Sequence, residues 1–269
     1  MRIGIAGLGL IGGSLALALR GGHEVTGFDS DERARAAAGA AGVRTVARVE
    51  ELAPADAVIV ATPMASLVPT LERLSSRSDG AVLLDTGSLK RGVVEWAARA
   101  PAAVRIVGGH PMAGSTASGF AAADPDLFRG RPFLLVPTER SDDGAMAIAG
   151  AIAREVGAIV TVCSADVHDR AMARLIAAPL ATAAALALGA ASEPLVGAAG
   201  PGFRDATRLA DTPLDLAVDV LFGSARDTGE ALTSVIEGLE RFRDALGRDD
   251  RESVRGLLRT ARSVREELG

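Results

Sequence analysis

The chain has 269 residues and a formal net charge of −5, with 48% hydrophobic and 23% charged residues. This balance is typical of a globular protein with one large or two modest domains, and it excludes a disordered chain. The negative charge argues against nucleic acid as a main partner. The single cysteine, Cys163, permits no internal disulfide, which favours the reducing cytoplasm.

The N-terminus combines a short buried strand, a glycine-rich turn and a helix. Residues 2–6 (RIGIA) predict the strand, residues 7–12 (GLGLIG) read G-x-G-x-x-G, and residues 14–20 suit an apolar helix. The first glycine allows a tight turn, the second lets a pyrophosphate approach the backbone, and the third lets the helix pack against the strand. Free N–H groups at the helix start attract phosphate. The candidate cofactor-binding residues here are Gly7, Gly9, Leu10, Ile11 and Gly12.

A second strand, residues 24–28 (EVTGF), ends at Asp29. A carboxylate about 20 residues after the glycines accepts hydrogen bonds from the ribose of NAD and repels the 2′-phosphate of NADP. We therefore expect a dinucleotide site that prefers NAD, although Arg33 and Arg35 leave NADP open. The alternative reading makes Asp29 only a turn or cap residue. The same context explains the apolar N-terminus better than a signal peptide does, and no other membrane-spanning segment is expected.

Strands and helices alternate through the first part of the chain. Further strands are expected at residues 56–61, 81–85, 104–107, 133–136 and 159–162, with helices at 31–42, 66–75, 92–100 and 144–156. Such alternation predicts βαβ units and a mainly parallel sheet of the α/β class, in which ligands bind beyond the carboxyl ends of the strands. The residues that fall at those ends are the glycine loop, Asp29, the turn Ala61, Thr62, Pro63, and Ser88 and His110. This shared edge predicts one active site.

From about residue 166 the pattern becomes helical. We expect an NAD-binding Rossmann domain over residues 1–165 and a helical substrate and dimerisation domain over residues 166–269. Helices are predicted at 169–191, with a kink at Pro179, and at 215–223, 228–247 and 249–268. Their apolar stripes exceed what one small domain needs, so a homodimer through these helices is expected. No cluster of cysteine and histidine has metal-ligand spacing, so no metal site is predicted.

Of the three histidines, His110 is the candidate for catalysis, because it follows a strand and reaches the cofactor edge. Imidazole titrates near neutrality, so it can take a proton from a substrate hydroxyl while hydride leaves the same carbon. The alternative is a structural histidine in a Gly/Pro turn. His23 is expected at the surface, and His168 at a helix start or hinge.

Ser88 and two arginines carry both a functional and a structural interpretation. Ser88 would form a hydrogen bond at the same site, or it would cap a helix. Arg204 and Arg208 lie four residues apart and would grip a carboxylate with two hydrogen bonds each. Alternatively they would form salt bridges with Asp205 or Asp211.

These motifs, taken in order, resemble the prephenate/arogenate dehydrogenase family. The matching stretches are GLGLIGGSLA (7–16), ATP (61–63), DTGSLK (85–90), GGHPMAG (108–114), LFRGRPFLLVPT (127–138), VHD (167–169) and GFRDATR (202–208). They span most of the chain in the family's order. HPMAG together with GFRDATR is far more specific than the glycine loop.

The resemblance implies a Rossmann domain, a helical dimerisation domain and oxidative decarboxylation of a cyclohexadienyl carboxylate in tyrosine biosynthesis. Hydride passes to NAD(P)⁺, the ring carboxylate leaves as CO₂, and the ring becomes aromatic. The resemblance implies that His110 hydrogen-bonds the ring hydroxyl with help from Ser88. The substrate-binding residues that it implies are Arg208, with Asp205 orienting the local turn, and Ser115 at the start of the loop that binds the substrate side chain. Arg204 is a further candidate from its spacing to Arg208.

Two stretches depart from the family's pattern. Residues 176–180 read IAAPL where the family usually has Ser-His-Leu-Pro-His, and residues 214–219 read LDLAVD where a tryptophan is common. The missing groups lie on the substrate side, so the substrate is less defined than the cofactor. Arogenate, or an amino-substituted prephenate in secondary metabolism, stays open.

Two rival classes remain. β-Hydroxyacid dehydrogenases share the plan but use a lysine on the long helix of the second domain. The only lysine here is Lys90 in the first domain, where it would hold an anion or stand at a helix start. The other rival is an NAD-binding regulatory protein with a decayed substrate pocket. Retention of His110, Ser88 and Arg208 argues against it.

Overall fold

The computed structural model describes residues 1–76, 80–114 and 117–267. Their contacts form two units, Met1–Met172 with Asp211–Ser224, and Ala173–Ala210 with Ala225–Gly269. Relative to the expected division after residue 165, the first unit also takes in residues 166–172 and 211–224. The reason is local packing. Asp169 accepts hydrogen bonds from the backbone at residues 90 and 91, and a Cβ on Gly223 would overlap the Leu89 side chain.

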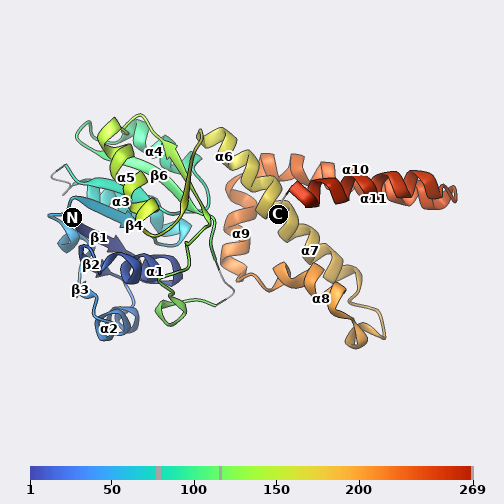
Figure 1. The fold of residues 1–269 in the computed structure, drawn as a ribbon, viewed down its shortest axis with the longest axis horizontal. Coiled ribbons are helices and arrows are strands. Elements are labelled where there is room, and N and C mark those ends of the chain that lie inside the picture. Colours follow the sequence, from blue (N-terminus) through green and yellow to red (C-terminus); the bar gives the residue numbers. More distant parts are fainter. Residues whose placement is uncertain (77–79, 115–116, 268–269) are drawn as a thin grey trace. The chain divides into compact units, whose positions relative to one another are not determined.

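A single sheet organises the first unit (Figure 1). Its strands are β1 (Arg2–Ala6), β2 (Glu24–Phe28), β3 (Arg44–Val46), β4 (Ala57–Val60), β5 (Val82–Asp85), β6 (Arg105–Pro111), β7 (Pro132–Pro137) and β8 (Ile159–Val162). They lie in the order β3-β2-β1-β4-β5-β6-β7-β8, and every described neighbouring pair is parallel except β6–β7. The run 3-2-1-4-5-6 is that of a doubly wound dinucleotide-binding sheet. The predicted mainly parallel α/β sheet is confirmed.

Helices cover both faces of this sheet because its central strands are apolar on both faces. The helices of the first unit are α1 (Leu10–Leu19), α2 (Glu32–Ala40), α3 (Met64–Ser75), α4 (Arg91–Arg99), α5 (Asp143–Glu155), α6 (Ala165–Met172) and α9 (Leu214–Gly223). In β4, Ile59 packs in the core cluster that contains α1 and α5, whereas Val58 and Val60 pack in the cluster that contains α3 and α4. Successive strand residues point to opposite faces, so a buried parallel strand reads as a continuous hydrophobic run.

The second unit is helical. Its helices are α7 (Ala178–Gly189), α8 (Pro201–Thr207), α10 (Ala225–Gly247) and α11 (Arg251–Glu267). The long helix predicted at 169–191 is interrupted by a π-turn, Ala173–Ala177, directly before α7. Pro179 explains why the π-turn lies here, since proline has no N–H to donate to the carbonyl of Leu175.

The run Ala165–Gly189, taken as one helix, contains an 18-residue stretch with a mean hydropathy of 1.7, so it is long and apolar enough to cross a membrane. From the sequence, no membrane-spanning segment was expected here, only a long helix at 169–191. Core helices of water-soluble proteins pass the same test. Here Ala173 and Ala178 are buried against Ala231 of α10, and His168 and Asp169 are buried among polar partners. Packing within this single chain therefore covers part of the apolar run, while Leu175 and Leu188 remain exposed.

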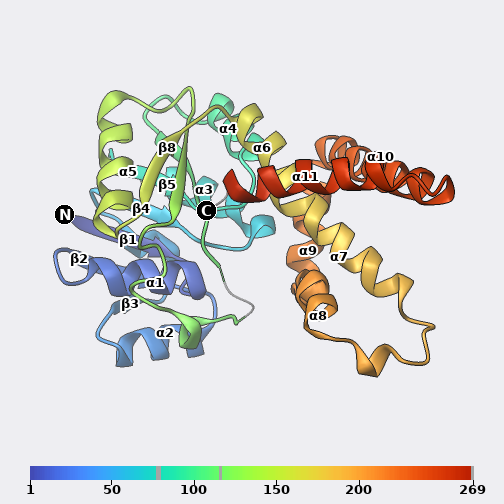
Figure 2. The same ribbon diagram turned by 45° about the vertical axis from the view of Figure 1, so that its right-hand side comes forward.

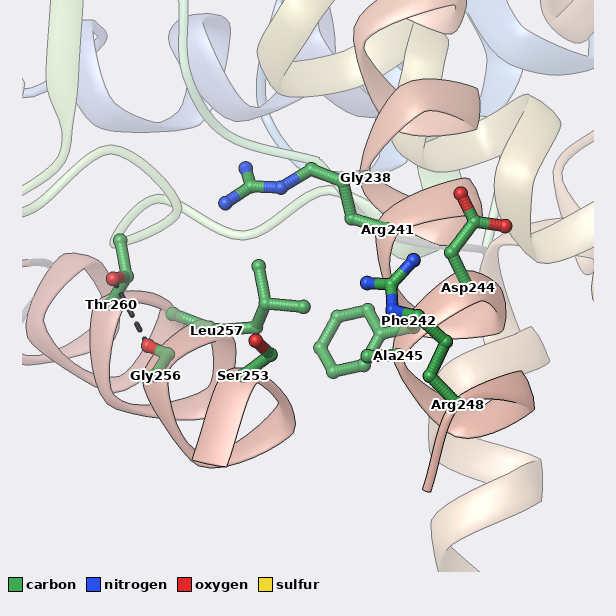
Figure 3. A pocket seen from close by; sticks show the side chains of 11 residues that line it. Gly238, Arg241, Phe242, Asp244, Ala245, Arg248, Ser253, Gly256, Leu257 and Thr260 are labelled. Atoms are coloured by element: carbon green, nitrogen blue, oxygen red, sulfur yellow. Dashed lines mark hydrogen bonds between the residues drawn. The ribbon is translucent and has the colours of Figure 1, made fainter. Parts of the chain in front are cut away.

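Helices α10 and α11 pack side by side as a hairpin (Figure 2). Between them lies a groove of about 570 Å³, into which Phe242 and Leu257 project from the two helices (Figure 3). Large apolar side chains of the hairpin also remain exposed on this single chain: Ile236, Leu239, Leu246, Leu258 and Val264. The last helix was predicted to end at residue 268, which lies outside the described residues.

Candidate active site

The glycine loop joins β1 to α1 where the strand order reverses, between β1 and β4. Gly7 has φ +94°, and a Cβ there would overlap the carbonyl of Ala61. A Cβ on Gly12 would overlap the Gly7 carbonyl, so α1 can approach β1 only with glycine at this position. Gly9 is different, because a Cβ there would meet nothing within 4 Å. Gly9 is the N-cap of α1, and no side chain accepts a hydrogen bond from the first N–H groups of this helix. These N–H groups and the open space beside Gly9 suit a pyrophosphate.

The other predicted cofactor residues surround this loop. Leu10 and Ile11 form the first turn of α1, and Ala61 follows β4 with its carbonyl against the glycine turn. Pro63 is the N-cap of α3. Thr62 has a buried Oγ1 for which no described residue supplies a hydrogen-bond partner. An unpaired buried hydroxyl beside a glycine loop fits a ligand that bonds to it.

Asp29 follows β2 and reaches back to the glycine loop. Its Oδ2 accepts from Leu8 N at 2.7 Å, and its Oδ1 accepts from Asp31 N at 2.9 Å. Asp31 caps α2 by accepting from Arg33 N, so the interpretation of Asp29 as the helix cap is wrong. A carboxylate offers about four acceptor sites, so this one keeps capacity for ribose hydroxyls.

His110 lies near the carboxyl end of β6, where it is 7% exposed. The strand continues beyond the predicted end at residue 107, because residues 107–111 pair with the antiparallel strand β7. The Nδ1 atom of His110 lies 2.9 Å from Nε2 of His168. Burial, and then the positive charge of Lys90, hold the pKa of His110 well below its ordinary value. The imidazole is therefore neutral near pH 7 and able to accept a proton.

His168 and Asp169 continue the contact inward. His168 is buried within α6, and its Nδ1 lies 2.7 Å from Oδ1 of Asp169. The Asp169 carboxylate also accepts from Lys90 N at 2.9 Å and Arg91 N at 3.0 Å, so it caps α4 from another helix. Burial raises the pKa of Asp169, but the hydrogen bonds from His168 and from these two N–H groups hold it below its ordinary value.

The sequence reading missed this role of His168, which it expected at a helix start or hinge. Its partner lies 58 residues away in the chain, beyond the range of any local pattern. The VHD stretch, one of the motifs that resemble the family, was the available signal. The position of His168 in a predicted helix did not indicate that its side chain would contact His110.

Lys90 is fully buried. Its Nζ donates to the Asp85 carboxylate and to the Gly109 carbonyl, the latter at 2.7 Å. Oδ2 of Asp85 accepts from Gly109 N at 3.1 Å, so the pair holds both backbone groups of the residue before His110. Burial lowers the pKa of Lys90, and Asp85 opposes that shift. The Lys90 side chain is therefore not exposed at the start of α4, and the anion that it binds is the carboxylate of Asp85.

Ser88 is half-buried in the turn between β5 and α4. The N-cap of α4 is Lys90, so the interpretation of Ser88 as a helix cap is wrong. Among the described residues, none forms a hydrogen bond with the Ser88 hydroxyl. Because Lys90 contacts Gly109, this turn lies beside the end of β6 that carries His110.

The predicted substrate arginines lie in the second unit, at α8 and the turn after it. Arg204 and Arg208 are exposed, as is Asp205. Arg204 Nε donates to the Ala199 carbonyl at 3.2 Å. Within the described part of the chain neither arginine pairs with Asp205 or Asp211, which removes the structural alternative of a salt bridge there.

Ser115 lies outside the described residues. After it the chain returns over α1, where Ala123 and Phe120 contact Gly13 closely enough that a Cβ there would lie 2.9 Å from each. His23 is half-buried, and its Nε2 lies 2.7 Å from Oε2 of Glu155, so it links two surface elements.

Comparison with known proteins gives the same family over both units. The family model for the prephenate dehydrogenase nucleotide-binding domain matches residues 15–162, and the model for the prephenate dehydrogenase dimerization domain matches residues 164–260. A prephenate dehydrogenase of Bacillus subtilis is 33% identical over 98% of this chain and 75% of its own length.

Two solved structures resemble the whole chain. Synechocystis arogenate dehydrogenase has a TM-score of 0.88 and 28% identity, covering 100% of both chains. Prephenate dehydrogenase from A. aeolicus, in complex with hydroxyphenyl propionate and NAD⁺, has a TM-score of 0.91 and 25% identity, covering 100% of this chain and 99% of its own. The buried, ion-paired Lys90 also leaves no lysine for the β-hydroxyacid dehydrogenase chemistry considered above. The chain belongs to the prephenate dehydrogenase family.

Proposed function

We propose that this protein catalyses the NAD-dependent oxidative decarboxylation of prephenate or arogenate in tyrosine biosynthesis. The observation that carries this proposal is the neutral, buried imidazole of His110 in the same unit as a glycine loop with an open helix N-terminus. The A. aeolicus relative supports it, because that structure holds NAD⁺ and an aromatic acid.

The cofactor fits the first unit. Gly9 leaves the backbone open to a pyrophosphate, the orphaned Oγ1 of Thr62 offers a hydrogen bond, and Asp29 keeps acceptor sites for the ribose. NAD⁺, when bound, supplies the hydride acceptor. The carboxylate of Asp29 favours NAD over NADP, whose 2′-phosphate would meet a like charge.

His110 would act on the hydroxyl of the substrate ring. Its neutral imidazole accepts the hydroxyl hydrogen bond and polarises the O–H group, which eases departure of hydride from the same carbon. The electrons of the breaking bond to the ring carboxylate stay in the ring, CO₂ leaves, and the ring becomes aromatic. Ser88 would bond to the same hydroxyl. Aromatisation supplies the driving force, so the chain mainly has to orient the substrate.

The substrate side is the part on which alternatives remain. We assign carboxylate binding to Arg208, with Asp205 and Arg204 beside it and Ser115 at the side-chain loop. Ala177 and Leu180, where the family usually has polar residues, are buried. This apolar surface favours an altered side-chain preference, so arogenate or an amino-substituted prephenate is the second candidate.

The two parts of the chain have different tasks in this proposal. Residues 1–165 bind the cofactor, and residues 166–269 contribute substrate binding and dimerisation. The exposed apolar side chains of α10 and α11 support a homodimer through these helices. The protein would act in the cytoplasm, since its one cysteine requires no oxidising compartment.

The test is the appearance of NADH absorbance with prephenate and then arogenate, each with NAD and with NADP. A rate with either acid supports the reaction and identifies the preferred substrate. An amino-substituted prephenate is assayed next if both acids fail. Measurable NAD binding without turnover of any of the three would contradict the proposal and favour a regulatory protein.

A further inference from the structure

We infer that Asp169 and His168 are positioning residues that fix the ring tautomer of His110 and so present its Nε2 lone pair to the substrate. The inference deepens the proposed function and rests on it for its catalytic meaning. The geometry lies entirely in the first unit, in a buried row that runs from Asp169 through His168 to His110.

The hydrogen bonds of the row have a defined direction because Asp169, at its inner end, can only accept hydrogen bonds. Asp169 is a carboxylate that already receives Lys90 N at 2.9 Å and Arg91 N at 3.0 Å. Its Oδ1 lies 2.7 Å from His168 Nδ1, so that nitrogen must carry the proton. A neutral imidazole has one N–H, so Nε2 of His168 then holds a lone pair.

The contact between the two histidines makes the tautomer of His110 depend on that of His168. His168 Nε2 lies 2.9 Å from His110 Nδ1, and one of the two nitrogens must donate. Since Nε2 of His168 is the acceptor, Nδ1 of His110 carries the proton. The lone pair of His110 is therefore on Nε2, the nitrogen left free of this contact, where a hydroxyl hydrogen bond can be accepted.

The opposite arrangement leaves buried groups mismatched. A proton on His168 Nε2 would put the Nδ1 lone pair against the Asp169 carboxylate, with two acceptors 2.7 Å apart. A second proton on His110 would place an added positive charge near the buried ammonium of Lys90. A second proton on His168 would make its Nε2 a donor and put the His110 proton on Nε2, an outcome that the measurement below distinguishes. With one proton on each ring, the row selects one tautomer for each histidine.

The tautomers can be measured directly by ¹⁵N NMR of the imidazole nitrogens, since the chain has only three histidines. In the unaltered protein we expect the His110 proton on Nδ1. In Asp169→Asn, an NH₂ group in place of Oδ1 would donate to His168 Nδ1, while the amide oxygen in place of Oδ2 keeps the bond from Arg91 N and Lys90 N loses its acceptor. The row then reverses, and the His110 proton moves to Nε2.

The matched control is Asp166→Asn, which makes the same substitution three residues earlier on α6. Asp166 is 71% exposed and pairs with the Arg91 side chain, outside the row. It should leave the His110 tautomer and the turnover rate unchanged. In Asp169→Asn, kcat should fall on the order of 10²–10⁴-fold while the affinity for NAD changes little.

A pair of variants at His168 keeps the test open if Asp169→Asn fails to fold. His168→Gln retains an amide oxygen that can accept from His110 Nδ1, whereas His168→Leu retains no acceptor. The Nδ1-protonated tautomer and much of kcat should survive in the glutamine variant and be lost in the leucine variant. A purely structural role would make the two variants differ in stability but not in the His110 tautomer.

Two results would overturn the inference. One is a His110 proton on Nε2 in the unaltered protein, and the other is an unchanged His110 tautomer in both Asp169→Asn and His168→Leu. The NMR measurement needs no substrate. If no cyclohexadienyl acid is turned over while the tautomers behave as expected, the proposed function fails and the structural inference stands.

Discussion

The pKa of a histidine depends on its surroundings, and His110 is a clear case of this dependence. An imidazole in water has a pKa of about 6.5. Around His110, burial comes first, followed by the charge of Lys90, and both lower its pKa. Asp169 acts in the opposite direction but is the smallest influence. The ring stays neutral to lower pH than a free histidine.

This shift predicts the pH dependence of catalysis. The neutral ring is the active form, so kcat/KM is full above the lowered pKa and falls as the pH drops through it. We expect the acidic limb of kcat/KM assigned to His110 to lie below pH ~6.5. The measurement is a pH profile of kcat/KM, with His110→Ala as the comparison. That variant should lose kcat on the order of 10²–10⁴-fold and lose the limb. A limb at or above the ordinary histidine value would contradict the neutral-ring assignment.

Asp29 makes a second prediction at the scale of one residue. Replacing Asp29 by Ser removes the charge that favours NAD, so KM for NAD should rise about tenfold, roughly 1.4 kcal/mol, and the preference over NADP should shrink. The control is Asp31→Ser, the same substitution at the N-cap of α2, where serine also caps well. Kinetics with both cofactors decide the matter, and an unchanged cofactor ratio in Asp29→Ser would show that Asp29 does not read the ribose.

At the scale of elements, polar contacts between elements hold the site in place. The Asp169 carboxylate ties α6 to the start of α4, and the Asp85–Lys90 pair ties the turn after β5 to Gly109 in β6. These ties explain why β6 carries His110 in a defined position although it lies at the end of a strand. They also explain why a lysine is buried in a chain that otherwise uses arginine.

The Lys90 pair predicts a large loss of stability. Lys90→Met leaves the Asp85 carboxylate buried without its partner, which should lower the free energy of unfolding by about 3–5 kcal/mol. Denaturant unfolding measures this change. The double variant Lys90→Met with Asp85→Asn removes both charges and should recover part of the loss. Equal stability of Lys90→Met and the unaltered protein would mean that the buried ion pair contributes nothing.

At the scale of the whole molecule, large apolar side chains are exposed on both helices of the α10–α11 hairpin. Leu239 is 60% exposed on α10, and Leu258 is 57% exposed on α11. Where such exposed apolar side chains gather in one patch, they are typical of a surface that another protein covers. The matching family model describes a dimerization domain over this region.

We therefore predict that charge on this surface breaks the dimer. The double substitution Leu239→Glu and Leu258→Glu should shift the sedimenting species from a dimer to a single chain. Glu240→Gln, at an exposed neighbouring position of α10, serves as the control and should stay dimeric. Persistence of a dimer in the double variant would place the interface elsewhere.

The sequence by itself determined the architecture of the first unit and the cofactor edge. Strand periodicity, glycine spacing and the acid after β2 are local patterns, and the steric demands at Gly7 and Gly12 follow from the backbone alone. The same local patterns predicted the helical second part. They did not predict the π-turn before Pro179, because the choice among helical hydrogen-bond patterns depends on the packing around the helix.

Only the tertiary structure decided the surroundings of His110. His168 lies 58 residues from it, and Asp169 lies 79 residues from Lys90, so these contacts exist only once the sheet and α6 have packed. The burial of Lys90 against Asp85 also depends on the tertiary structure, since no local pattern shows that a polar side chain will be buried against a partner. Periodicity reports which face of an element is apolar, whereas the proton on His110 depends on groups that distant segments bring to it.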